Sequence, residues 1–174
     1  MENLYPFITS SLALVFTIFS FWWMNWRKGK LVVIGPRSFS AAINGKKITI
    51  YLPFVFYNSG AIPITIEHQI LEITNKKDAG PIKFIAVVNK LGSSEGRCFA
   101  TQFVVNGRES IKMICEFQGD VGDSEVQTQK YFIRLKGKLG HKRKWSKFID
   151  FVLDFKNNKI TSSFLTYDNF IELN

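Results

Sequence analysis

The chain has 174 residues, with 23 lysines and arginines against 14 aspartates and glutamates, and a formal net charge of +9. This length suits one domain, and the absence of fixed-period repeats, low-complexity runs and long linkers argues against a second domain or a repeat array. The basic charge favours anionic partners such as lipid headgroups, nucleic acid or an acidic protein, although a charge that serves only solubility gives the same balance.

The N-terminal stretch is the most distinctive part of the sequence. Residues 4–26 read LYPFITSSLALVFTIFSFWWMNW, without a charged side chain. About 20 helical residues cross the ~30 Å hydrocarbon core of a bilayer, so this stretch predicts a transmembrane helix. A buried core helix is disfavoured because the apolar character is nearly all-round. A cleaved signal peptide is the weaker alternative, since the stretch lacks a cationic n-region and an A-x-A-like site, and its apolar core is long.

Both ends of this stretch resemble membrane interfaces, where aromatic rings settle at headgroup level. The predicted interface residues are Tyr5, Trp22, Trp23, Trp26, Arg27, Lys28 and Lys30. The cations follow the stretch and none precedes it, so the positive-inside rule places the C-terminal part in the cytoplasm. The sequence therefore predicts a single-pass membrane protein, with an anchor over residues 1–29 that contacts lipid through residues 4–26, and a soluble domain over residues 30–174.

Beyond the anchor, apolar residues recur with a period of two. Residues 48–56 alternate in this way, and after the turn residues Asn58, Ser59 and Gly60 the pattern resumes over residues 64–70, which places His68 on the inward face. Further strands are predicted near residues 82–88, 97–105, 111–117, 130–136, 150–155 and 160–167. Short alternating strands with turns between them and no further helix predict an antiparallel β-sandwich.

The segment PFVFYNSGAIPITIEHQI, within residues 53–70, resembles the strand-turn-strand of immunoglobulin-like domains of the CARDB type. It is also similar to small, uncharacterised bacterial proteins in which one N-terminal span carries such a sandwich. The resemblance is strongest over residues 30–73. It implies an immunoglobulin-like adhesive or scaffolding module and transfers no catalytic residue.

A basic hairpin, residues 136–147 with the sequence KGKLGHKRKWSK, stands out from the rest of the domain. Its candidate contacts to an anionic partner are Lys138, His141, Lys142, Arg143, Lys144, Trp145 and Lys147. Such a loop can dock on phosphates while its indole stacks or inserts at an interface, or it can be an ordinary solvated hairpin.

The position of this hairpin follows from counting strands. If consecutive strands alternate in direction from Leu31, the connections far from the anchor are residues 44–47, 75–81, 106–109 and 137–144. Those near it are residues 58–62, 89–96, 118–125 and 156–159. This count predicts a cationic tip that points away from the bilayer and toward a partner.

No catalytic, cofactor or metal site is predicted. Cys98 and Cys115 show no metal-binding spacing, and by strand parity they point apart, so a disulfide is not expected. Four residues of strand separate Asp150 from Asp154 by ~13 Å, which is too far for an acid–base pair. A core role suits His68 better than catalysis, because no nucleophile or carboxylate accompanies it in the pattern.

The favoured function is a membrane-anchored, non-catalytic interaction or scaffolding module with a protein partner, such as an accessory subunit of a membrane complex. The alternative is a binder of nucleic acid or anionic lipid that acts through its basic loops at the membrane surface. A third class, an extracytoplasmic domain on a signal anchor, requires the opposite orientation.

Overall fold

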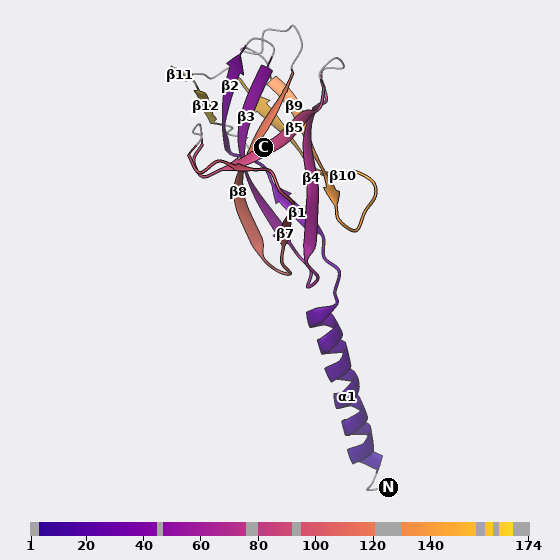
Figure 1. The fold of residues 1–174 in the computed structure, drawn as a ribbon. Coiled ribbons are helices and arrows are strands. Elements are labelled where there is room, and N and C mark those ends of the chain that lie inside the picture. The colour runs from indigo at the N-terminus through magenta and orange to yellow at the C-terminus, as the bar shows by residue number, and fades with distance from the viewer. Residues whose placement is uncertain are drawn as a thin grey trace.

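The computed structural model describes residues 4–44, 47–75, 80–91, 95–120, 130–155, 159–161 and 164–168. One long helix projects from one end of a curled antiparallel sheet (Figure 1). We call the end at which the helix joins the helix end of the sheet, and the opposite end the far end.

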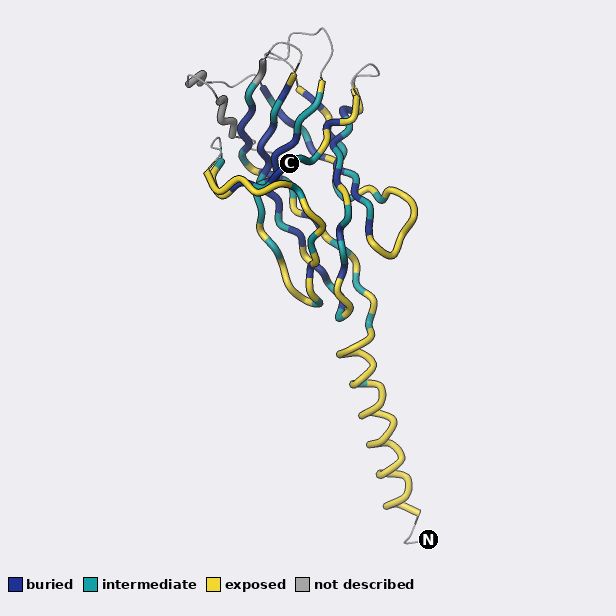
Figure 2. The backbone as a smooth tube through the Cα atoms, in the orientation of Figure 1, coloured by how far each residue is buried: buried dark blue, intermediate teal, exposed yellow. Residues whose placement is uncertain are grey.

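Helix α1 spans Leu4–Asn25 and is apolar along its whole length, as its sequence predicts. None of its residues is buried against the sheet (Figure 2), so it is not a core helix. Its 22 residues and mean hydropathy of 1.7 satisfy the requirements for a membrane span, which a signal sequence near the N-terminus would also satisfy. Helix α1 is therefore a candidate membrane-spanning helix.

The rest of the described chain is almost entirely β-strand. The strands are β1 (Leu31–Ile34), β2 (Ser38–Asn44), β3 (Lys47–Asn58), β4 (Ile64–Ile73), β5 (Ile82–Val88), β6 (Cys98–Phe99), β7 (Phe103–Val105), β8 (Ser110–Asp120), β9 (Lys130–Leu139), β10 (Ser146–Asp154), β11 (Lys159–Thr161) and β12 (Phe164–Asp168). The prediction of a mainly β domain behind one apolar helix is confirmed.

All twelve strands belong to one antiparallel sheet. Its order is β10-β9-β4-β5-β8-β3-β2-β12-β11, with β1 paired to β3, β6 to β5 and β7 to β4. The sheet curls until β10 lies beside β1, where Gly35 packs against Ile149 and Phe151, so that it is nearly closed. The expected division into two facing sheets is not confirmed, because the hydrogen bonding is continuous through one sheet.

Strand β3 shows how the sequence fits this sheet. β8 pairs with one edge of β3 along its whole length, while β2 and β1 share the other edge. The N–H of Asn58 donates to the carbonyl of Glu109, next to β8, at 3.0 Å. The backbone N–H groups of every second residue from Asn58 back to Phe54 therefore point toward β8. The backbone nitrogen of Pro53 points to the other edge of β3, in the gap between β1 and β2. A proline in this central strand therefore breaks no ladder hydrogen bond.

The predicted strand over residues 97–105 is in fact two strands that run in opposite directions. β6 is antiparallel to β5 and β7 is antiparallel to β4, while β5 and β4 are antiparallel to each other. This extra reversal inverts the direction of β8 and of both strands of the basic hairpin relative to the prediction. The connection of residues 106–109 consequently lies at the helix end, and β8 and β10 finish at the far end.

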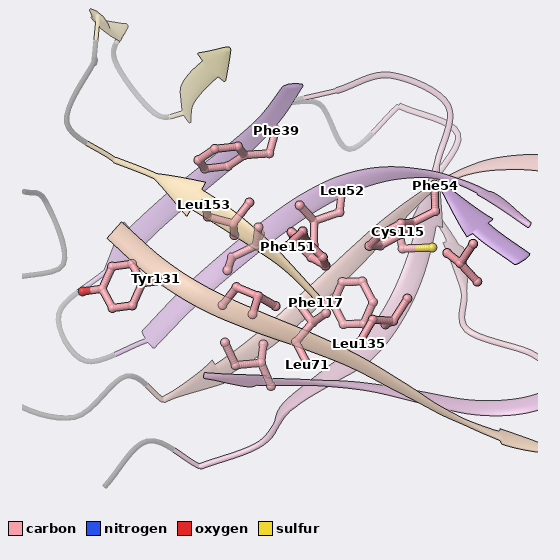
Figure 3. Packing of buried hydrophobic residues seen from close by; sticks show 14 of the residues in the cluster. Phe39, Leu52, Phe54, Leu71, Cys115, Phe117, Tyr131, Leu135, Phe151 and Leu153 are labelled. Atoms are coloured by element: carbon pink, nitrogen blue, oxygen red, sulfur yellow. The ribbon is translucent and has the colours of Figure 1, made fainter. Parts of the chain in front are cut away.

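The core fills the inside of the curled sheet with aromatic and branched side chains (Figure 3). Phe54 contacts Phe117 and Phe151 with ring centroids 6.4 and 5.8 Å apart, which joins strands β3, β8 and β10 across the interior. Tyr131 and Phe39 both pack on Phe155, toward the far end. These edge-to-face contacts are the usual arrangement of buried aromatic pairs.

A β-bulge in β4 corrects one prediction about its faces. The pairing of β4 with β9 shifts register between Ile66 and His68, so the inward positions move by one residue. His68 is exposed, contrary to the expectation of a core histidine, and Gln69 is buried instead. Strict alternation predicted from sequence cannot detect such an inserted residue.

Candidate functional site

The basic hairpin is formed by β9 and β10 and their connection, residues 140–145, which we call its tip. The N–H of Gly140 donates to the carbonyl of Thr65 at 3.0 Å, and the N–H of Lys142 donates to the carbonyl of Leu139 at 2.8 Å. Because Thr65 lies at the start of β4, the first of these bonds places the tip in the half of the sheet nearer α1, to the side of β4 and set back from the turns that contact the helix (Figure 1). The prediction of a tip that points away from the anchor is therefore wrong.

The side chains of the tip extend into solvent. His141, Lys142, Arg143 and Lys144 are exposed (Figure 2), and Trp145 is 45% exposed. Among the described residues, no carboxylate forms an ion pair with Lys142, Arg143 or Lys144. The tip therefore combines uncompensated positive charge with an accessible indole.

The other two predicted contact residues are engaged elsewhere. Lys138 pairs with Glu67 at 2.9 Å, and Lys147 pairs with Asp150 at 2.7 Å. Their charges are thus largely compensated, so these two lysines belong to the face of the sheet rather than to the tip.

The outer face of β4, β9 and β10 carries a lattice of ion pairs next to the tip. Besides the two pairs above, the lattice contains Arg134–Asp150, Lys136–Glu72 and Lys130–Asp154. Hydrogen bonds first from Arg134 and then from Lys147 lower the pKa of Asp150 to about 2. The same pairing raises the pKa of Arg134. Asp150 and Asp154 are therefore ion-pair partners of cations.

A second cationic group lies where α1 meets the sheet, in a structure we call the joint (residues 26–30, 58–62 and 106–109). The guanidinium of Arg27 donates to the carbonyl of Ser59 at 2.5 Å and lies 4.7 Å from the centroid of the Trp23 ring. The N–H of Lys30 donates to the hydroxyl of Ser59 at 3.0 Å, and the N–H of Ala61 donates to the carbonyl of Arg27 at 2.9 Å. The chain leaving the helix is thus bound directly to the β3–β4 turn.

Arg108 completes the joint from the β7–β8 turn. Its guanidinium donates to the carbonyls of Trp23 and Met24, each at 3.2 Å. Those carbonyls lie in the last turn of α1, where a cation also complements the helix dipole. The backbone of Arg108 has a φ of 61°, which is unfavourable for a non-glycine residue. In this conformation its side chain points to the helix.

Close backbone packing also holds the joint together. A Cβ atom on Gly60 would overlap the backbone of Gly29, and one on Gly29 would overlap Gly60. The side chain of Asn58 is buried between them and the sheet, where it donates to the carbonyls of Ile62 and Val105 at 2.8 and 3.1 Å. Only glycines allow this approach, so the helix is attached by a fixed contact as well as by its peptide chain.

The predicted interface residues fall into two groups. Tyr5 lies near the start of α1, far from the sheet, while Trp22, Trp23 and Trp26 are exposed at the joint. Lys28 and Lys30 are exposed beside them. Sequence reasoning missed Arg108 and Ser59, although the Asn106-Gly107 and Asn58-Ser59-Gly60 turn signals mark the loops that carry them.

The two cysteines are both free thiols, Cys98 exposed and Cys115 buried in the core. The predicted opposite parity does not explain this difference, because strand register places both cysteines opposite Val87, from the two edges of β5. Burial raises the pKa of Cys115 well above its usual range, so its thiol is unreactive.

Comparisons with known proteins add little to this geometry. No protein-family model and no curated protein sequence matches the chain. Among solved structures, the crystal structure of a protein from Archaeoglobus fulgidus is similar with a TM-score of 0.36 and 10% sequence identity, covering 75% of this chain and 98% of that chain. A likeness at this level carries no argument about function. The resemblance to CARDB-type domains stays a prediction.

Proposed function

We propose that the protein is a single-pass, membrane-anchored, non-catalytic module that holds its β domain against anionic lipid headgroups through the tip of the basic hairpin. The observation that carries this proposal is the position of the tip: Lys142, Arg143 and Lys144 lie in the half of the sheet nearer α1, with no described carboxylate paired to them. A cation near an anionic leaflet contributes ~1 kcal/mol, and an exposed indole settles at headgroup level.

The geometry favours lipid over the alternative of nucleic acid. A nucleic-acid site is expected on a surface that the bilayer leaves free, whereas Arg27 and Arg108 lie at the helix end and the tip lies in the half of the sheet nearer α1. The joint adds to the argument because it fixes the domain relative to α1 and so keeps the tip on the membrane side. The far end of the sheet is then available to other molecules.

Amide hydrogen exchange of the full chain in nanodiscs tests the lipid contact. Amides of residues 140–145 should exchange more slowly in discs with anionic lipid than in zwitterionic discs, and high salt should abolish the difference. A variant with Lys142→Glu, Arg143→Glu and Lys144→Glu should show no difference. Equal exchange of the wild-type tip in both kinds of disc would refute the proposed lipid contact.

We also propose that the β domain lies in the cytoplasm, because Arg27, Lys28 and Lys30 follow the span directly. Cys98 is exposed and Cys115 is buried, so a membrane-impermeant thiol reagent has a single reactive target. Labelling of Cys98 only after cell lysis is expected, with Cys98→Ser as the control. Labelling in intact cells would place the domain outside and overturn this orientation.

A further inference from the structure

The second unusual surface is the outer face of β1, β3 and β8 near the helix end, which we call the lower outer face. Its outward residues are Val32, Ile34, Pro53, Val55, Tyr57, Lys112 and Ile114. Strand register places them side by side: Val32 opposite Tyr57, Ile34 opposite Val55, Val55 opposite Lys112, and Pro53 opposite Ile114. Cross-strand neighbours of this kind lie within contact distance of one another and form one patch.

The patch is apolar and accessible. Val32 is 46% exposed, Ile34 56% and Tyr57 39%. Beside them lies a groove of about 410 Å³ whose lining includes Pro53, Val55 and Ile114, together with Val88 and Asn89 at the end of β5. A hollow next to exposed branched side chains is typical of a surface that receives apolar groups from another molecule.

This surface contrasts with the outer face of β4, β9 and β10. There most of the outward side chains are paired ions, such as Lys138 with Glu67 and Lys136 with Glu72, although Phe132 is exposed among them. A solvated face of an antiparallel sheet is usually polar in that way. The lower outer face departs from the rule over several adjacent strands, which marks it as a candidate interaction surface.

Two occupants fit the surface poorly. The bilayer is a poor occupant, because the strands run away from α1 and the face lies along the membrane normal rather than across it (Figure 1). At most its lower border, at Val32 and Tyr57, approaches the headgroups. A second copy would bring like charges together, since Lys112 lies within the face and Lys30 is exposed at its lower border. Both cations instead suit a partner that carries carboxylates.

We propose that the lower outer face binds an acidic, apolar segment of another membrane protein, located just outside that protein's own span. The height of the face determines this choice, because at most ~30 Å of extended chain separates Ile34 from Asn25 at the end of α1. A segment leaving a neighbouring span reaches this height directly. The inference rests on the proposed membrane anchoring and assigns the anchored domain its protein partner.

Site-specific photocrosslinking of the full chain in its native membranes tests this inference. A benzoylphenylalanine is placed at Ile34 or Tyr57, and the matched control carries it at Phe132, which is 53% exposed on the outer face of β9. The crosslinked peptides are then identified by mass spectrometry. The expected adduct from Ile34 and Tyr57, absent from Phe132, is one partner segment that contains Asp or Glu and lies within about ten residues of a transmembrane span.

Charge exchange then tests the chemistry of the contact. Lys112→Glu should reduce the crosslink yield at Ile34 at least tenfold, and replacing the partner's carboxylate by lysine should restore it. The inference would be overturned if Ile34 and Tyr57 gave no adduct, or gave adducts only with lipid or with a second copy of this chain. An identical adduct from Phe132 would also overturn it. These outcomes are distinct from failure of the proposed anchoring, which would appear as release of the protein from membranes by alkaline carbonate.

Discussion

In the half of the sheet nearer α1, the joint and the tip of the basic hairpin present cations in opposite ways. In the joint, Arg27 and Arg108 donate to backbone carbonyls of the β3–β4 turn and of α1. In the tip, Lys142 and Lys144 extend into solvent with no described carboxylate beside them. Hydrogen-bonded cations fix a geometry, whereas unpaired cations are available to an outside anion, so the first group holds the helix to the sheet and the second is the proposed lipid contact.

The largest expected effect comes from reversing the charge of the tip. Lys142→Glu, Arg143→Glu and Lys144→Glu together should weaken association with anionic lipid by about 3 kcal/mol or more, because each lost cation removes ~1 kcal/mol. The thermal midpoint should not change, since these side chains have no ion-pair partner among the described residues. The measurement is the amount of anionic lipid that copurifies with the full chain from mixed nanodiscs.

A matched control separates location from net charge. Lys47 and Lys83 lie toward the far end, and changing both to Glu gives the same net charge as changing Lys142 and Lys144 to Glu. This control should retain its anionic lipid. Equal loss in both variants would mean that overall charge, not the tip, attracts the lipid.

In the joint, the expected effect is on stability and not on lipid. Gly60→Ala places a methyl group against the backbone of Gly29, and overpacking of this kind costs about 1–3 kcal/mol. The thermal midpoint should fall by roughly 2–4 °C for each kcal/mol. Gly80→Ala is the control, because nothing lies within 4 Å of the added methyl group. Equal midpoints for the two variants would show that the joint is looser than described.

Arg108→Gly separates orientation from folding within the joint. Glycine relieves the positive φ of 61° but removes the two hydrogen bonds to α1, a loss of about 1 kcal/mol each. The β domain should keep its thermal midpoint while α1 becomes free to tilt. Distances between spin labels on α1 and on the far end of the sheet should broaden; an unchanged distribution would remove Arg108 from the orienting group.

The smallest effect concerns the paired ions beside the tip. Because the pKa of Asp150 is about 2 in the folded protein and 3.8 ordinarily, its pairing stabilises the fold above pH 3.8, and this contribution disappears as the pH falls toward 2. Asp150 is 43% exposed, so solvent screening keeps the contribution below ~1 kcal/mol. Asp150→Asn should therefore lower stability slightly at pH 7 and not at pH 2 in acid unfolding, whereas an equal loss at both pH values would assign the effect to packing.

The sequence alone predicts the basic hairpin but not the joint. The hairpin is visible because its cations are consecutive along the chain, and α1 because its apolar residues are. The joint is not visible, since it unites Arg27, Ser59 and Arg108 from three distant segments through tertiary contacts. Among these residues only Arg27 was predicted as part of the interface, on the basis of its position next to the span.

The direction of the hairpin could not be predicted for a related reason. Residues 97–105 are apolar enough to resemble one strand, but β6 pairs with β5 and β7 with β4. That choice depends on which edges are open in the folded sheet, and alternation of side chains contains no such information. Because this one reversal was not predicted, the tip was expected at the far end, whereas it lies in the half of the sheet nearer α1. The proposed ligand of the tip is therefore the lipid surface and not a partner away from the membrane.

The most direct test of the central claim is the depth of the tip in a bilayer. A spin label at His141→Cys in a Cys98→Ser chain, with Gly80→Cys as the far-end reference, is compared for exposure to oxygen and to a water-soluble nickel complex in anionic vesicles. We expect the label at position 141 to lie at headgroup level and the label at position 80 to lie in bulk water. Equal exposure of both labels to the nickel complex would contradict it.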